Sequence, residues 1–424
     1  MTRVHRRIAL VMAMAGLLAL PACGSSVSPA SSTSTAASTG NGVRRLTPVV
    51  QAQLDKAVKG VLARTGAPGV IVGLWIPGNG SYVRAFGVAD RNTRTAMSTG
   101  LRMRIGSGTK TFTVTGVLQL ADQGKLRLDD PVSRYVSGVP NGNRITLRQL
   151  AEMRSGLYSY SDDPAFETAL LADPHRAFTP QQLLRHAFGH PPQFRPGERF
   201  AYSNTNTVLL GLVVEKVSGQ PLARYLKQHV LTPSHLDHTL LPVGAEFPQP
   251  HAHGYTDETS SGAVLDATDW NPSWAWAAGA MTSDLTDLHA WAPMVATGTL
   301  LTPATQAQRL RMLPTGLPGA GYGLGIFKIN GWIGHNGSLP GYQSVTVYLP
   351  SARATLVVLV NTDISSAGSE PSTLFGRAVT GIVTPRNVYT LPSAPPASST
   401  PAAVSPSPRS SAHRPAVSDL MERL

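Results

Sequence analysis

The sequence contains only one cysteine in 424 residues, which excludes an internal disulfide framework and a zinc site built on cysteine ligands. Charged residues are also few, at 14%, while glycine (40) and proline (34) are abundant, a composition that argues against a coiled coil or a long helical bundle. Lysine and arginine outnumber aspartate and glutamate by 36 to 24, but outside the first residues they form no dense run. Because a phosphate footprint needs clustered cations, nucleic-acid binding is not predicted.

The first 22 residues have the pattern of a lipoprotein signal peptide. Three arginines precede an apolar stretch from Ile8 to Leu20, which is too short to span a bilayer comfortably. The single cysteine, Cys23, follows where a cleavage site belongs, and this arrangement resembles the lipobox of bacterial lipoproteins. We therefore expect lipidation at Cys23 and anchoring to the outer face of the cell membrane. A secreted protein with an unmodified cysteine is the alternative.

Two low-complexity segments flank the part of the chain that is expected to fold. Residues 23–42 are rich in Ser, Thr, Ala and Gly and lack apolar periodicity, which is typical of a flexible tether. Residues 390–424 are rich in Pro, Ser and Ala and bury too little apolar surface to offset their chain entropy, so a disordered tail is expected. The predicted folded domain is 43–389.

The apolar pattern of this domain predicts an α+β fold. Residues 49–63 have helical spacing, and two pairs of short apolar runs, within 70–88 and 344–361, are joined by turn sequences typical of hairpins. The middle, from residue 109 to about residue 291, is predicted to be mainly helical. Strands near both ends with helices between them predict an antiparallel sheet flanked by helices, with an inserted, mainly helical subdomain.

The first of three chemically suggestive motifs places a serine and a lysine three residues apart. Ser107 stands just before a helical pattern that Gly124 closes, so Lys110 should lie one turn later on the same face. The lysine can then take the proton of the Ser107 hydroxyl or stabilise the alkoxide. A capping serine followed by a solvated lysine is the alternative, because this spacing is common by chance.

The second motif is Tyr202-Ser203-Asn204, which follows a Pro-Gly turn and precedes another helical pattern. A tyrosine beside a serine and a lysine can relay a proton if the cation lowers its pKa. The amide of Asn204 can hold both the lysine and a substrate carbonyl. A buried tyrosine next to a turn asparagine is the alternative.

The third motif, Gly334-His335-Asn336-Gly337-Ser338, precedes an apolar strand. Small residues at a sheet edge would let a substrate lie against the backbone, and a backbone N–H there could pair with that of Ser107 as an oxyanion hole. Taken alone, the segment is also compatible with a simple glycine-rich connection.

In order and spacing, these three motifs resemble the active-site elements of the penicillin-recognising serine hydrolases, the group of class C β-lactamases and low-molecular-mass D-alanyl-D-alanine carboxypeptidases. The closest branch resembles the secreted actinobacterial D-alanyl-D-alanine carboxypeptidases, which share the runs at residues 202–206 and 154–158 and the His-x-Gly third motif. The resemblance implies a β-lactamase/transpeptidase-like fold for the domain.

The resemblance also implies roles for individual residues. Ser107 would be the nucleophile, Lys110 its activating partner and Tyr202 the general acid/base. The N–H groups of Ser107 and Ser338 would form the oxyanion hole. Trp274 matches a position that lines the cleft, although a core role for it is equally compatible with the sequence. The residues implied in substrate binding are Asn204, His335, Gly337, Ser338, Ser161 and Trp274.

Two positions depart from the pattern of the family. The middle residue of the third motif, usually threonine, is Asn336. Carboxypeptidases of this branch place an arginine after the Gly-Leu-Gly strand to grip a terminal carboxylate, whereas this chain has Phe327 followed by Lys328. Because successive strand residues face opposite sides, Lys328 does not simply replace that arginine.

We therefore expect an exported serine hydrolase in which Ser107 forms an acyl-enzyme with an amide or ester carbonyl. The resemblance implies D-alanyl-D-alanine carboxypeptidase activity on peptidoglycan stem peptides, with β-lactams as acylating mimics. An esterase or β-lactamase on the same scaffold, and a non-catalytic cell-wall-binding lipoprotein, are the alternatives. No cofactor and no metal are predicted, because the pair His251 and His253 lacks a third ligand cluster.

Overall fold

An eight-stranded antiparallel sheet organises residues 42–391, the part of the chain that the computed structural model describes. The predicted signal peptide, the lipidation site Cys23, and nearly all of the predicted tether and tail lie outside these residues. Both predicted hairpins are confirmed, and they lie side by side in the sheet. In sheet order the strands are β2 (Gly80–Gly87), β1 (Gly69–Ile76), β12 (Ala354–Val360), β11 (Tyr342–Leu349), β10 (Trp332–Leu339), β9 (Phe327–Ile329), β8 (Ala320–Tyr322) and β7 (Leu313–Pro314).

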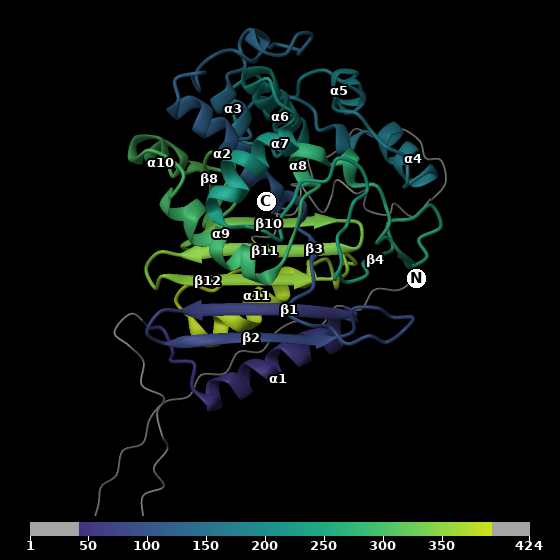
Figure 1. Ribbon diagram of the computed structural model, residues 1–424, viewed down its shortest axis with the longest axis vertical. Coiled ribbons are helices and arrows are strands. Elements are labelled where there is room, and N and C mark those ends of the chain that lie inside the picture. The colour runs from purple at the N-terminus through teal and green to yellow at the C-terminus, as the bar shows by residue number, and fades with distance from the viewer. Residues whose placement is uncertain (1–41, 392–424) are drawn as a thin grey trace, which may run out of the picture. The chain divides into compact units, whose positions relative to one another are not determined.

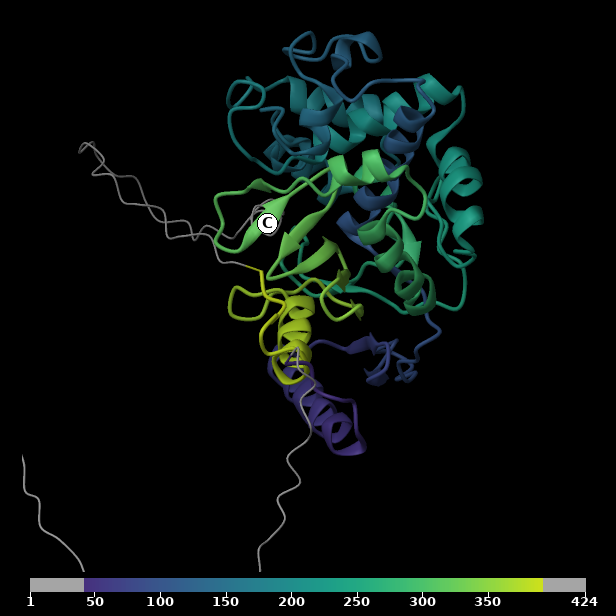
Figure 2. The ribbon, with the colours of Figure 1, turned by 90° about the vertical axis from the view of Figure 1, so that its left-hand side faces the viewer.

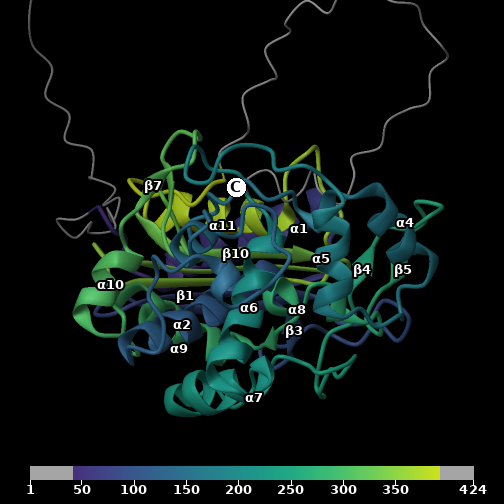
Figure 3. The same ribbon diagram turned by 90° about the horizontal axis from the view of Figure 1, so that it is seen from above.

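Both faces of the central strands are buried, which explains why these strands are nearly continuous apolar runs in the sequence. Successive side chains of a strand point to opposite faces. In β1, Val70 and Val72 belong to one apolar cluster, whereas Ile71 between them belongs to another. The sheet therefore separates two cores, and a layer of helices covers each of them (Figure 3).

Two helices cover the face that Val70 and Val72 share. They are α1 (Pro48–Thr65) and α11 (Pro371–Val383), which pack against each other (Figure 3). The predicted N-terminal helix is thus confirmed, and its ends have local causes: the Thr47 side chain caps the first turn, and Gly66, with φ of +67°, ends the last.

The opposite face carries a mainly helical region, which is the inserted subdomain that the sequence predicts (Figures 1 and 2). Within residues 42–391, no helix is both long enough and apolar enough to cross a membrane. The α-helices of this region are α2 (Thr109–Asp122), α3 (Leu147–Ala151), α4 (Pro164–Ala172), α5 (Pro180–Phe188), α6 (Asn204–Ser218), α7 (Leu222–Leu226), α8 (Trp276–Gly279), α9 (Leu285–Thr297) and α10 (Pro303–Arg309).

Short elements connect these helices. There are two small antiparallel pairs: β3 with β6, which links distant parts of the chain, and β4 with β5, which are close in the sequence. The short strands are β3 (Met103–Arg104), β4 (Tyr255–Thr256), β5 (Leu265–Asp266) and β6 (Thr282–Ser283). The 3₁₀ helices are η1 (Gly106–Gly108), η2 (Val132–Arg134), η3 (Tyr160–Asp162), η5 (Thr232–Ser234) and η6 (Pro272–Trp274), and η4 (Lys227–Leu231) is a π-helical turn.

The position of strand β10 in the sheet differs in part from the expectation that the third motif lies at a sheet edge. The sequence predicts the third motif at a sheet edge, but β10 lies inside the sheet, between β9 and β11. On the β9 side, however, pairing stops at Gly334. From His335 to Leu339 the strand is therefore paired only with β11, and this half of β10 is the open edge that the sequence suggested.

Candidate active site

Ser107 and Lys110 meet at the junction of a 3₁₀ helix and α2. The 3₁₀ helix η1 contains Ser107 and continues directly into α2, so that Lys110 lies in the first turn of α2. Lys110 Nζ is 2.8 Å from Ser107 Oγ, and both side chains are buried. The predicted proximity of the two residues is confirmed.

The surroundings of Lys110 suit a proton acceptor. Its Nζ also lies 2.7 Å from Asn204 Oδ1 and 2.8 Å from the carbonyl oxygen of Ala278, and both of these oxygens can only accept hydrogen bonds. Burial holds the pKa of the Lys110 ammonium well below its usual range. As a neutral amine, Lys110 has two N–H groups for these two acceptors and a lone pair for the hydroxyl of Ser107.

Tyr202 lies next to Ser107 and Lys110, as the sequence suggested. Its Oη is buried and has no well-formed hydrogen bond within residues 42–391. Burial raises the pKa of Tyr202 above its usual value, although the neighbouring Ser107 hydroxyl lowers it somewhat. Lys110 Nζ lies over the ring, 4.9 Å from its centroid. The condition that the sequence set for a proton relay, a pKa of Tyr202 lowered by the cation, is therefore not met, and Tyr202 is a neutral phenol that can donate a proton.

Asn204 connects Lys110 to a row of serine hydroxyls. While its Oδ1 accepts from Lys110, its Nδ2 donates to Ser161 Oγ at 3.0 Å. The backbone N–H of Asn204 donates to Ser159 Oγ at 3.1 Å, and the two serine hydroxyls are 2.9 Å apart. These contacts fix the amide orientation of Asn204 and place Ser161 beside the predicted catalytic residues.

His335 occupies the third-motif position as a neutral ring. Burial, with the charge of Lys110 as a smaller cause, lowers the pKa of His335 to about 3. Its Nδ1 is 2.5 Å from the carbonyl oxygen of Asn336, which can only accept, so Nδ1 carries the proton. Its Nε2 is 3.1 Å from Tyr322 Oη and must accept from that hydroxyl. Of the two roles weighed for this position, cationic or hydrogen-bonding, the structure favours the second.

The predicted oxyanion-hole segments touch each other. A Cβ on Gly106 would lie 2.7 Å from the backbone nitrogen of Ser338, and a Cβ on Gly337 would lie 2.7 Å from that of Ser107. Only glycine allows this contact, and Gly106 also has φ of +51°. The backbones of η1 and β10 are thus pressed together at the two residues predicted to donate N–H groups to an oxyanion.

The structure also shows where the side chains of Trp274, Phe327 and Lys328 lie. The Trp274 ring packs in the core near Phe166, which favours the core role over cleft lining. The Phe327 side chain is buried 5.4 Å from the His335 ring, measured between centroids, whereas Lys328 is exposed on the opposite side of β9. No cation of β9 therefore lies beside His335.

Sequence reasoning missed several residues of the site. Tyr322 lies in a glycine-rich run that the sequence displays, but only the fold brings it to His335. The carbonyl of Ala278 carries no sequence signal at all. Glu370 is the third: its Oε2 accepts from Asn336 Nδ2 at 3.3 Å, and its charge contributes to raising the pKa of Tyr202.

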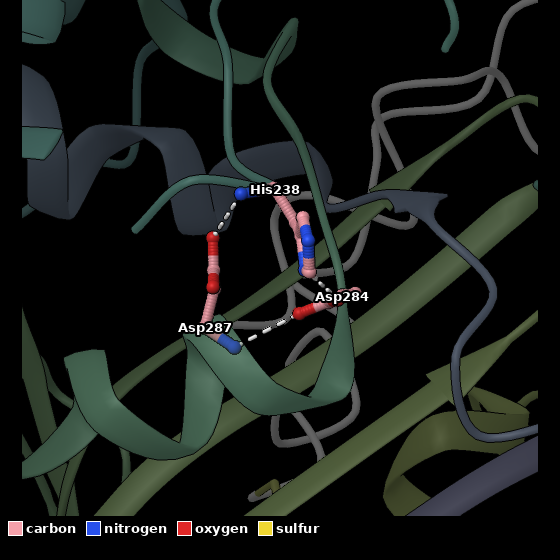
Figure 4. Close-up of side chains that lie close together, drawn as sticks. All are labelled: His238, Asp284 and Asp287. Carbon is pink, nitrogen blue, oxygen red and sulfur yellow. Dashed lines mark hydrogen bonds and ion pairs between the residues drawn. The ribbon is translucent and has the colours of Figure 1, made fainter. Parts of the chain in front are cut away.

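One group with the composition of a metal site lies elsewhere, at the start of α9 (Figure 4). His238, Asp284 and Asp287 each offer a ligand atom within 4.8 Å of the others. Their hydrogen bonds explain the arrangement: Asp284 caps α9 and pairs with His238 Nδ1 at 2.6 Å, while Asp287 accepts from the His238 backbone at 2.8 Å. The pair His251 and His253, set aside from the sequence, does not join them.

The chain matches a known protein family over most of its length. A sequence model of the beta-lactamase family matches residues 54–374. Protein flp of Staphylococcus aureus (strain N315) is 29% identical over 332 residues, which cover 75% of this chain and 64% of that protein. The chain thus spans less than two thirds of the length of this curated relative.

Solved structures of two further proteins are also similar to this chain. A D-stereospecific amidohydrolase from Streptomyces sp. is 31% identical, with a TM-score of 0.70 over 78% of this chain and 97% of that one. The D-amino acid amidase from Ochrobactrum anthropi SV3 is 28% identical, with a TM-score of 0.65 over 73% and 92%. The predicted β-lactamase-like fold is confirmed, whereas the closer likeness to carboxypeptidases stays a prediction.

Proposed function

The chain belongs to the beta-lactamase family as a serine hydrolase, and we propose that it cleaves D-alanyl-type amide bonds through an acyl-enzyme on Ser107. The observation that carries this proposal is the geometry of Lys110, whose buried Nζ lies 2.8 Å from Ser107 Oγ between two oxygens that can only accept. In this arrangement the neutral amine of Lys110 can accept the proton of the Ser107 hydroxyl.

The proposed reaction uses only residues of this chain. Lys110 takes the proton of Ser107 while Oγ attacks the carbonyl carbon, and the N–H groups of Ser107 and Ser338 stabilise the oxyanion. The neutral phenol of Tyr202 donates its proton to the leaving amine as the amide C–N bond breaks, and it is reprotonated from Lys110. Water then attacks the ester carbonyl and gives a proton to Tyr202, while Tyr202 passes its own proton to Lys110. Lys110 returns this proton to Ser107 Oγ as the ester C–O bond breaks and the acid is released.

The finer form of the proposal is a D-alanyl-D-alanine carboxypeptidase that acts on peptidoglycan stem peptides and is acylated by β-lactams. It is supported by the motif pattern and by the row of Ser159, Ser161 and Asn204, which offers polar groups to a peptide. The predicted lipoprotein signal would place this activity at the outer face of the membrane.

A second candidate, an amidase or esterase that needs no free carboxylate, is favoured by one observation. Phe327 occupies the place where a cation would grip a terminal carboxylate, and Lys328 faces away from the site. The similarity to a D-stereospecific amidohydrolase and to a D-amino acid amidase supports this candidate as well.

A hydrolysis assay separates these proposals. The purified protein and its Ser107→Ala variant would be given N-acetyl-D-alanyl-D-alanine and D-alanine amide, with amine or ammonia release measured. Hydrolysis of the dipeptide would support the carboxypeptidase, and hydrolysis of the amide alone would support the amidase. Hydrolysis of both substrates by the Ser107→Ala variant would contradict the mechanism that the two candidates share, in which Ser107 is the nucleophile.

A further inference from the structure

A second pocket lies in the mainly helical region, between the segment that precedes α3 and the loop that joins α5 to α6. Its volume is about 700 Å³, which is within the usual range for small-molecule sites. Three arginines line it, Arg144, Arg195 and Arg199, together with one carboxylate, Glu198. The pocket lining therefore has an excess of two positive charges, and none of its residues is part of the candidate active site.

The three arginines are available to a ligand. Each of them is exposed, and none forms an ion pair with another residue of the described range 42–391. The guanidinium of Arg199 lies over the ring of Phe194, with 4.3 Å between Cζ and the ring centroid, a contact that does not use its N–H groups. Glu198 accepts a hydrogen bond from the backbone N–H of Arg195 at 3.2 Å, so the loop itself engages this carboxylate.

The backbone around the pocket is held in place by the neighbouring loop. The N–H of Gln193 donates to the carbonyl oxygen of Gly156 at 2.8 Å, and the N–H of Gly197 donates to that of Arg154 at 2.7 Å. Gly156 has φ of +77°, and a Cβ there would collide with the carbonyl oxygen of Phe194. Because the loop is already fixed in this way, a ligand does not have to order it on binding.

The charge and the walls of the pocket fit a phosphate ester. A guanidinium presents a planar fork of N–H donors that matches the oxygens of a phosphate or a carboxylate. A phosphate monoester carries about 1.5 to 2 negative charges at pH 7 and three acceptor oxygens, which matches the excess charge of the lining. Phe194, Pro192 and Pro196 add apolar surface, and the pocket has room for an organic group beside the phosphate.

We propose that this arginine pocket, defined by Arg144, Arg195 and Arg199, binds a phosphate monoester of a small organic molecule of about the size of a sugar. The phosphate oxygens accept hydrogen bonds from the guanidinium groups, and the organic group lies against Phe194 and the prolines. The proposal goes beyond the proposed function and does not depend on it, because no residue of the pocket takes part in the chemistry at Ser107.

Calorimetric titration of the purified protein at low ionic strength tests the proposal, with glucose 6-phosphate as the probe. Glucose 6-phosphate should bind at one site and more weakly as salt is added, because salt screens the attraction between exposed charges. Glucose, inorganic phosphate and succinate should each bind at least about 10-fold more weakly. No binding of glucose 6-phosphate at millimolar concentration would overturn the proposal. Equal affinity for succinate would overturn the assignment of a phosphate, and equal affinity for inorganic phosphate would overturn the role of the organic group.

Variants locate the binding site. Arg195→Gln and Arg199→Gln should each weaken the binding of glucose 6-phosphate about 10-fold, because each removes a charged hydrogen-bond donor. The matched control is Arg176→Gln, since Arg176 is also exposed and also lies over a phenylalanine ring, that of Phe178, at 4.9 Å, but outside the pocket. The control should keep the wild-type affinity.

Two results with the variants would contradict the proposal. Unchanged affinity in the double variant Arg195→Gln/Arg199→Gln would place the ligand elsewhere. Equal weakening in Arg176→Gln would mean that the probe responds only to the positive charge of the whole protein. Circular dichroism would confirm that the variants keep the fold, and the comparison of ligands on the wild-type protein decides the matter if they do not.

Discussion

Gly337 and Ser107 are in backbone contact: a Cβ placed on Gly337 would lie 2.7 Å from the nitrogen of Ser107, and closer still to the carbonyl oxygen of Ile105. Strand β10 and the turn that carries the nucleophile are thus held at a separation that leaves no room for a methyl group. The position of Ser107 therefore depends on a residue that lies far from it in the sequence.

We predict that Gly337→Ala displaces the turn of Ser107 and lowers kcat/KM by at least about 100-fold, because about 1 Å of misplacement can cost that much. The variant should also lose thermal stability. The matched control is Gly60→Ala in α1, where a Cβ has room and alanine favours the helix, so stability should hold or rise by up to about 1 kcal/mol. Wild-type activity in Gly337→Ala would show that the contact does not position Ser107.

The pH dependence of acylation should report Lys110. Because burial holds the pKa of Lys110 well below its usual range, the free amine forms at lower pH than for an exposed lysine. With a neutral substrate, kcat/KM should rise as the pH increases through that lowered pKa. A rise only near the ordinary lysine value, about 10.4, would contradict a buried base.

A Lys110→Arg variant tests the same role without removing the positive charge. A guanidinium does not deprotonate in proteins, so this variant should lose at least about 100-fold in kcat/KM and show no rise attributable to residue 110. Circular dichroism would confirm that the fold is kept. Near-wild-type activity would mean that residue 110 acts only through its charge.

The neutral His335 should make the fold sensitive to acid. Its pKa is about 3 in the folded protein against an ordinary 6.5, so between these values the unfolded chain binds a proton that the folded chain does not. The free energy of unfolding should therefore fall as the pH drops below 6.5, by about 1.4 kcal/mol per pH unit from this residue. Urea unfolding of the wild type and His335→Gln at several pH values would measure it. Identical slopes for the two proteins would contradict the prediction.

The N-terminal prediction can be checked in cells. Cys23→Ala should move the protein from the membrane fraction to the soluble fraction, because the acyl anchor is lost. Ser25→Ala, a change two residues further on, is the control and should leave the fractionation as it is. If Cys23→Ala stays in the membrane fraction, the cysteine is not the anchor.

Local sequence patterns predicted those features of the fold that depend on residues close together in the chain. Helical spacing brought Ser107 and Lys110 together, since residues three apart share a helix face, and apolar runs with turn residues gave both hairpins. The placement of Asn204 next to Lys110 came from family resemblance and not from spacing, as 94 residues separate them.

The remaining features depend on tertiary contacts that no local pattern shows. The neutral state of His335 follows from burial and from the hydroxyl of Tyr322. The raised pKa of Tyr202 follows from burial of the side chain, which outweighs the opposing effect of the Ser107 hydroxyl. Glu370 reaches the third motif only because α11 returns along the back of the sheet.

The central claim is that Ser107 forms an acyl-enzyme, and the mass of the protein after exposure to benzylpenicillin tests it most directly. The wild-type protein should gain the mass of one penicillin, and peptide mapping should place it on Ser107. The adduct should be absent in Ser107→Ala. It should form at least about 100-fold more slowly in Lys110→Arg. An adduct of equal yield in Ser107→Ala, or one mapped to another residue, would contradict the account.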